Sequence, residues 1–415
     1  MAGGLSVYGR LLADRPARAF TLAALVARMP LSMTGLGIVL LVSIETGSFT
    51  RAGLVSATVT VATAICSPWW GRRIDHVGQA PVLLLTIGTF VVGLIGIIAT
   101  VLLGFPLPLT LVAAVVTGVG APVAGACVRA RWAYRSSDEQ HLNTAYAYEA
   151  VMDEVVFIIG PVLATFLATT VASSLGLIAA AVLGLGGTLA LAAQRSTQPP
   201  AHAPSRPSSP DHPRLTSRPP ISRRLLIPVV LACAALGVLF GGMEVVIIAF
   251  ATEAGILRLA GLLAMAWAAG SLVAGVATGT VEWRSSPARR FRVAALALAA
   301  SLVPLSFVDR PWLVAALLVV SGLAIAPTLI ASVAVTQASV PAGRLTEALG
   351  WTQLGLYAGV GAGAAVVGRV IDVGGAHGGF LTVAAAGGLL VVAALTVRTP
   401  PSAASVMVRA DDHPG

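Results

Sequence analysis

The sequence predicts an all-α, polytopic membrane protein with 12 transmembrane helices in two pseudo-symmetric six-helix bundles. Three observations lead to this class. Apolar residues make up 57% of the 415 residues and charged residues 10%, whereas about a quarter of a soluble domain is charged. All 26 basic residues are arginines, and they fall almost entirely in alternate gaps between apolar stretches. A polar segment rich in proline, serine and arginine divides the chain near its middle.

Twelve apolar stretches are long enough to be considered as spans, since about 20 apolar residues cross a bilayer as a helix. They cover residues 20–43, 52–70, 81–103, 107–128, 143–169, 174–193, 225–251, 257–281, 293–308, 311–337, 346–369 and 378–397. The ninth is the shortest. Helices are expected because a membrane-spanning barrel would show short segments of alternating polarity instead.

The arginines orient the predicted spans. An even number of spans puts both termini on one side, and 21 of the 26 arginines lie on that side. Because basic loops are retained inside the cell, we expect cytoplasmic termini and a location in the cytoplasmic (plasma) membrane. The net charge of +9 then follows from membrane insertion and predicts no nucleic-acid partner.

The polar middle segment divides the chain into domains. We expect an N-terminal six-helix bundle over 1–194, a cytoplasmic linker over 195–222, a C-terminal six-helix bundle over 223–398 and a cytoplasmic tail over 399–415. The halves resemble each other: Ala52-Gly53-Leu54 recurs 208 residues later as Ala260-Gly261-Leu262. Such matches indicate one six-helix unit that has been duplicated, as in many carriers.

The loop between the second and third spans carries a motif. It reads Gly71-Arg72-Arg73-Ile74-Asp75-His76-Val77-Gly78-Gln79. This resembles the cytoplasmic signature of the major facilitator superfamily, although Arg73 replaces a usual leucine and Gln79 a usual basic residue. The resemblance covers residues 18 to 398 and implies that family's fold and secondary transport. It also implies a conformational latch formed by Gly71, Asp75 and Gly78, with Arg129 or Arg131 as partners of Asp75. The alternative is an ordinary charged loop.

A second resemblance lies in the fifth span. Gly160-Pro161 looks like the centre of a motif associated with antiporters of this superfamily, but the flanking glycines are missing. Pro161 is expected to kink the helix in either case. In the fourth span, Ala114 stands where many proton-coupled drug exporters carry an arginine, so a proton relay of that kind is not expected.

Charged residues inside spans are functional candidates because each costs at least a few kcal/mol at membrane depth. Arg28 lies roughly 12 Å into the first span, and Glu149 and Asp153 lie about 9 Å and 15 Å into the fifth. Glu149 and Asp153 share one helix face, so an ion pair with Arg28 is expected. It is either a protonatable coupling site, with Arg28 also able to dock an anionic group, or a structural ion pair. Glu154 points elsewhere and is expected to hydrogen-bond a neighbouring helix.

Glu244, in the seventh span, has no cation at its depth within its own half. A buried carboxylate without a partner favours its neutral form, which makes Glu244 the strongest single candidate for proton coupling. The alternative is a cavity-lining residue wetted by water.

Candidate substrate contacts are the polar and aromatic residues of the eighth and eleventh spans, namely Trp267, Thr352, Gln353 and Tyr357. Each has the alternative of ordinary packing. Tryptophans at predicted span ends are expected to anchor the helices at the membrane interface. These are Trp69, Trp70, Trp132, Trp283 and Trp312.

Together these features predict a secondary active transporter working by alternating access. We expect proton-coupled efflux of a moderately hydrophobic compound by a drug-efflux-like monomer, with no cofactor and no metal. The sparse polar inventory of the spans favours efflux over the alternative, proton-coupled uptake of an organic anion or sugar. The sequence contains no nucleotide-binding loop that would indicate ATP hydrolysis. A membrane-embedded enzyme and a non-transporting sensor are the remaining alternatives, and we expect no enzymatic activity.

Overall fold

The computed structural model describes residues 11–136, 139–201, 223–279, 285–340 and 345–397. Within these ranges the chain is almost entirely α-helical and contains no strand. The proposed linker lies mostly outside the described residues, as does the proposed tail.

The described part of the N-terminal half contains seven α-helices. They are α2 (Arg15–Thr46), α3 (Phe49–Val77), α4 (Gln79–Leu102), α5 (Leu107–Val119), α6 (Ala124–Arg135), α7 (Glu139–Thr170) and α8 (Leu175–Ala193), followed by the short 3-10 helix η1 (Arg195–Thr197). The C-terminal half contains α9 (Arg223–Glu253), η2 (Leu257–Leu259), α10 (Ala260–Gly279), α11 (Pro287–Leu302), η3 (Val303–Phe307), α12 (Pro311–Gly322), α13 (Ile325–Ser339) and α14 (Leu345–Thr396).

The chain has twelve membrane spans, as predicted. The helices do not correspond to the spans one to one. Helices α5 and α6 together form one span, and so do α12 and α13. Helix α14 contains two spans, because Gly375 has a φ of 65° and breaks its 52 residues into two arms. Only glycine adopts this left-handed backbone readily, so it makes the tight turn.

The ninth span is longer than the apolar stretch 293–308 suggests. Helix α11 begins at Pro287, where the Ser286 side chain caps it by accepting a hydrogen bond from the backbone N–H of Arg289. The first turns of α11 carry three arginines, and η3 extends the span to Phe307. The span was underestimated because arginines at a helix start lower the local hydropathy without ending the helix.

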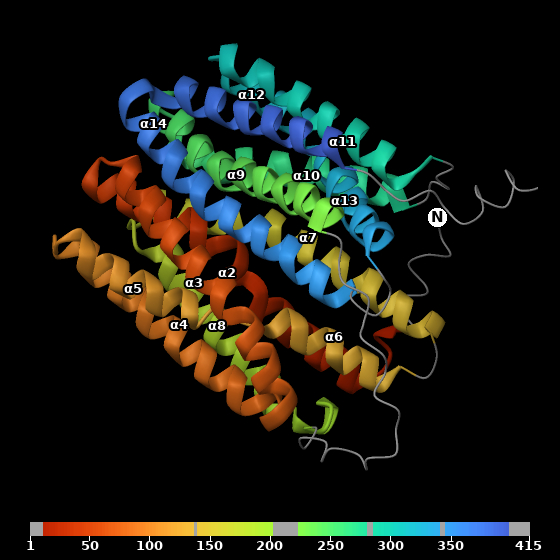
Figure 1. Cartoon of the computed structure of the whole chain (residues 1–415). Coiled ribbons are helices and arrows are strands. Elements are labelled where there is room, and N and C mark those ends of the chain that lie inside the picture. The colour runs from red at the N-terminus through yellow and green to blue at the C-terminus, as the bar shows by residue number, and fades with distance from the viewer. Residues whose placement is uncertain (1–10, 137–138, 202–222, 280–284, 341–344, 398–415) are drawn as a thin grey trace, which may run out of the picture.

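The two halves form two helical bundles that lie side by side. In Figure 1 the N-terminal half, red to yellow-green, occupies the lower part, and the C-terminal half, green to blue, the upper part. Helix α14 lies beside α9 of its own half and also contacts α3 of the other half. We call the end at which α2 and α9 begin the arginine-rich end, and the other the opposite end.

The broken spans support the internal repeat. The fourth span is interrupted after Val119 and the tenth after Gly322. A side chain at Gly118 would clash with the backbone carbonyl of Val59 in the second span, and one at Gly322 with that of Trp267 in the eighth. Val59 and Trp267 are themselves 208 residues apart, so the same helix contact occurs once in each half.

Candidate functional site

The two halves approach each other closely toward the opposite end, at a matched pair of glycines. Gly53 of α3 lies against the backbone of Ala364 in α14, and Gly261 of α10 lies against the backbone of Pro161 in α7. A Cβ atom at either glycine would clash with the facing carbonyl oxygen. Both glycines belong to the repeated Ala-Gly-Leu sequence. The repeat therefore marks the positions where the halves make backbone contact.

Asp372 adds a polar connection between the halves at the opposite end. Its carboxylate accepts hydrogen bonds from the backbone N–H groups of Phe49 and Thr50, at 2.8 and 2.9 Å, and from the hydroxyl of Ser48, at 2.9 Å. These groups belong to the first turn of α3, which has unpaired N–H groups and a positive helix-dipole end. Asp372 of α14 therefore caps a helix of the other half.

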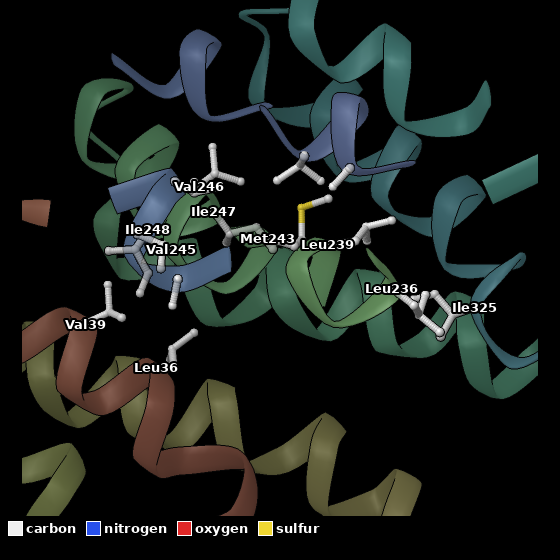
Figure 2. Close-up of a cluster of buried hydrophobic side chains, with 14 of the residues drawn as sticks. Leu36, Val39, Leu236, Leu239, Met243, Val245, Val246, Ile247, Ile248 and Ile325 are labelled. Atoms are coloured by element: carbon white, nitrogen blue, oxygen red, sulfur yellow. The ribbon is translucent and has the colours of Figure 1, made fainter. Parts of the chain in front are cut away.

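Apolar side chains fill the space between the halves next to these contacts. Leu36 and Val39 of α2 point toward the segment of α9 that carries Val245 and Ile248 (Figure 2). All four residues are at most 3% exposed and belong to the same hydrophobic cluster. This packing closes the opposite end to water between α2 and α9.

Several ion pairs near the arginine-rich end join residues within the N-terminal half. They include Arg28 with Glu149, Arg129 with Asp153, and Arg135 with Asp14, all in the N-terminal half. The halves are thus held together at the opposite end.

Arg28 is the centre of the buried charge cluster, and the predicted ion pair is confirmed. Its guanidinium donates to Glu149 Oε2 at 2.7 Å and to Asp153 Oδ1 at 2.8 Å, while Nε donates to the carbonyl of Ala24 at 3.1 Å. Nearby, the Ser32 hydroxyl donates to the carbonyl of Val156 at 2.8 Å. These bonds tie one face of α2 to one face of α7.

The two carboxylates of the cluster have different surroundings. Glu149 is fully buried, and its second oxygen accepts a hydrogen bond from Trp132 Nε1 at 2.9 Å. Asp153 is 28% exposed and also pairs with Arg129, at 2.5 Å. Asp153 is therefore the member of the cluster that water can reach, and it bridges two arginines.

Trp132 does not have the predicted role of an interface anchor. It is 1% exposed and packs edge to face on Phe20, with ring centroids 4.9 Å apart. The prediction was wrong because Trp132 lies on the inward face of α6, where its N–H meets Glu149. Trp283 lies outside the described residues.

Glu244 lies at the contact between the halves. Its carboxylate packs against Gly35 of α2, where any side chain would clash with it, and faces the backbone N–H of Leu36. The Glu244 side chain is partly buried, and within the described chain no cation lies at ion-pair distance. Glu244 is thus a lone carboxylate touching the other half of the molecule.

In the predicted latch motif, the chain turns at Gly78 and the helix does not end at Gly71. Helix α3 continues through Gly71 to Val77, and only Gly78, with a φ of 88°, makes the connection to α4. Gly71 and Asp75 are exposed. Among the residues that the structure describes, Asp75 has no ion pair.

Neither arginine expected beside Asp75 pairs with it. Arg129 is bound to Asp153. Arg131 is fully buried and donates to Gln79 Oε1 at 2.8 Å, to Thr197 Oγ1 at 2.7 Å and to the carbonyl of Leu191 at 2.9 Å. Arg131 therefore donates to carbonyl groups at the end of α8 that have no partner within the helix. Gln79, which stands where the motif usually has a basic residue, accepts a hydrogen bond from Arg131.

The remaining residues of the fifth span have structural surroundings. Helix α7 runs through Pro161 without interruption, and Gly160 makes room for Ser32 of α2. Glu154 is partly buried, and no hydrogen bond to a neighbouring helix is found for it within the described residues, contrary to expectation. Its spacing from Pro161 and Thr165 puts Glu154 on the face of α7 that meets α10.

The candidate substrate residues fall into two groups. Trp267 packs edge to face on Phe240 at 5.5 Å between ring centroids, and its buried indole N–H has no hydrogen-bond partner in the described structure. On α14, Gln353 and Tyr357 are exposed one helical turn apart, whereas Thr352 is buried and donates to the carbonyl of Leu349. No described contact joins the two groups.

Comparison with protein families decides the class of the molecule. The model of the Major Facilitator Superfamily matches residues 20–311, which is more than half of the chain. The chain belongs to the major facilitator superfamily. It is accordingly a multi-pass membrane protein of a family of secondary transporters. No curated protein sequence matches it.

Solved structures of superfamily transporters share its fold. A point mutant of the nucleoside transporter NupG has a TM-score of 0.69 at 13% identity, covering 91% of this chain and 98% of NupG. A bacterial homologue of the iron transporter ferroportin in an inward-facing state has a TM-score of 0.68 at 13% identity, covering 92% and 98%. The human organic anion transporter MFSD10 (TETRAN) has a TM-score of 0.59 at 15% identity, covering 93% and 100%.

Proposed function

We propose that this superfamily member exports a moderately hydrophobic small molecule in exchange for protons, with Glu244 as the proton-coupling residue. Its single most important support is the position of Glu244, a carboxylate without a cation at the contact between the two halves. The proposal includes cytoplasmic placement of the arginine-rich end, because 21 arginines lie on that side of the predicted spans.

The coupling follows from the cost of burying charge. An isolated carboxylate held against Gly35 between α2 and α9 would lose part of its hydration, and this costs the charged form more than the neutral acid. The opposite end is closed in this conformation, so closure and protonation of Glu244 favour each other. While that end is open, water reaches Glu244 and supplies its proton from outside. After closure the proton leaves toward the arginine-rich end, so protons move inward as the compound moves outward.

The buried cluster around Arg28 has a mainly structural role in this proposal. Glu149 and Asp153 both occupy its guanidinium, so docking an anionic substrate there would require breaking two ion pairs. This weakens the case for uptake of an organic anion. Asp153 remains a second site where protonation would matter, because it is partly exposed and holds both Arg28 and Arg129.

The substrate class is inferred from the chemistry of the candidate substrate contacts. Gln353 and Tyr357 of α14 and the indole of Trp267 offer aromatic surface with few polar groups, and no cluster of charges accompanies them in the part of the chain that the structure describes. If these residues contact one substrate, they suit a ligand with a large apolar surface and one or two hydrogen-bonding groups.

The test uses purified protein in liposomes that contain a pH-sensitive dye. A thermal-stabilisation screen of hydrophobic dyes and drugs first identifies a compound that the protein binds. An outward gradient of that compound should then drive proton entry in wild-type vesicles. In Glu244→Gln, gradient-driven proton movement should be lost while exchange of labelled for unlabelled compound continues.

The matched control is Glu45→Gln, which neutralises an exposed carboxylate near the end of α2 and should transport as the wild type does. Proton movement at the wild-type rate in Glu244→Gln would contradict the assignment of Glu244. Absence of any compound-dependent proton movement in the wild type would contradict proton exchange itself.

A further inference from the structure

A groove runs along the outer side of the C-terminal half. It has a volume of about 690 Å³ and is formed mainly by one face of α11 and by the α12–α13 break and the start of α13. Figure 1 shows α11 and α12 on the side of this half that faces away from α2 to α8. The groove is therefore separate from the contact between the halves.

Most of the groove wall is apolar and open to the outside. Val293 of α11 is 61% exposed and Ile330 of α13 is 43% exposed. At the inner end, the Ser301 hydroxyl donates to the carbonyl of Leu298 in its own helix at 2.7 Å, so it offers no free donor. In a membrane protein, an exposed apolar groove at this position contacts lipid chains.

The mouth of the groove is basic. Arg289 and Ser285 line it at the start of α11, and Arg290 follows in the next position. Arg289 is exposed, and its guanidinium has no carboxylate partner among the residues that the structure describes. The N-terminal end of α11 adds the positive end of its helix dipole.

The length of the groove matches one leaflet of a bilayer. From Arg290 to Ser301 the helix rises roughly 16 Å at 1.5 Å per residue, and half of the hydrocarbon core is about 15 Å. A phospholipid whose phosphate lies at Arg289 would place one acyl chain along the whole groove. Basic pockets between transmembrane helices are known to suit anionic headgroups.

We propose that this groove is a binding site for one anionic phospholipid, with the phosphate at Arg289 and an acyl chain between α11 and α13. The site is independent of the proposed transport function. Its inner end lies at Leu323 and Ala324, where the tenth span is broken, so a bound acyl chain would pack against the break.

Native mass spectrometry of the detergent-purified full chain tests the site with two lipids, phosphatidylglycerol and phosphatidylcholine. The wild type should retain one phosphatidylglycerol in preference to phosphatidylcholine. Arg289→Gln should weaken retention about fivefold, since one arginine contributes about 1 kcal/mol to anionic-lipid binding. Ala297→Phe should abolish retention by filling the groove.

Two matched variants serve as controls. Arg18→Gln removes an exposed arginine from the first turns of α2, and Leu296→Phe enlarges a neighbouring residue that does not line the groove. Both should retain lipid as the wild type does. Wild-type retention in Arg289→Gln, or equal retention of the two lipids, would overturn the proposal. Displacement of the lipid by millimolar glycerol phosphate would also overturn it, because the groove would then contribute nothing beyond the headgroup contact.

Discussion

At the scale of single residues, the buried charges of Arg28 and Glu149 are stabilised by their mutual ion pair and by a hydrogen bond from Trp132. Arg28 and Glu149 are both nearly inaccessible and satisfy each other through a 2.7 Å contact. Trp132 donates to the remaining Glu149 oxygen. Such a cluster contributes little net energy when complete, but losing one member leaves a buried charge without a partner.

Replacing Arg28 by methionine should therefore destabilise the protein strongly. Arg28→Met leaves Glu149 uncompensated and should cost about 3–5 kcal/mol, measured as a lower unfolding temperature in detergent. Adding Glu149→Gln should recover most of the loss, because the neutral amide needs no cation. Arg135→Met, which removes a half-exposed pair with Asp14, should cost less than about 1 kcal/mol. Equal losses in Arg28→Met and Arg135→Met would contradict this account.

At the scale of helices, glycines decide which elements touch across the two halves. Gly53 and Gly261 occur in the repeated sequence, and each allows the backbone of its helix to approach the other half. Membrane helices associate largely through such close packing, because lipid offers no hydrophobic driving force between them. The opposite end is thus closed by backbone contact as well as by apolar side chains.

Adding one methyl group at Gly53 should weaken this closure. Gly53→Ala would put Cβ into the carbonyl of Ala364, so α3 and α14 should move apart at the opposite end. Spin labels at positions 103 and 307, both exposed at that end, would report the change as a longer distance in a variant lacking the native cysteines. Gly88→Ala is the control, since nothing lies within 4 Å of its Cβ position. An unchanged distance in Gly53→Ala would show that this contact does not hold the end closed.

At the scale of the whole molecule, we expect an equilibrium between two conformations, one with the opposite end closed and one with it open. The Asp372 cap on α3 exists only when the opposite end is closed, because it joins α14 to the other half. Any bond made in one arrangement alone shifts the population toward that arrangement by its own free energy.

Asp372→Asn should consequently favour opening of that end. Loss of a helix cap costs about 1 kcal/mol, which corresponds to roughly a fivefold change in the ratio of the two conformations. The same pair of spin labels would show this as a larger fraction of long distances. Asp309→Asn is the control, because Asp309 contacts His377 within the C-terminal half. If both variants behave alike, the cap has no special influence on the conformation.

Sequence reasoning reached the Arg28 cluster but missed its contact with Trp132 and several polar contacts elsewhere. Helix periodicity put Glu149 and Asp153 on one face, and the high cost of isolated charge predicted their pairing with Arg28. Trp132 was misassigned and Asp372 was overlooked. Arg131 was expected beside Asp75, yet it binds Gln79 and the end of α8. In each case the partner is more than ten residues away in the chain, and spacing says nothing about which distant helix it meets.

The sequence by itself determined the membrane class, the twelve crossings and the duplicated six-helix plan. These properties depend on apolar length, arginine placement and repeated short sequences, all of which are measured along the chain. The tertiary structure alone decided that Glu244 lies against Gly35, that Asp372 caps α3 and that the halves meet at Gly53 and Gly261. Such contacts depend on how each helix is rotated and tilted against its neighbours, and that is set by packing between segments far apart in sequence.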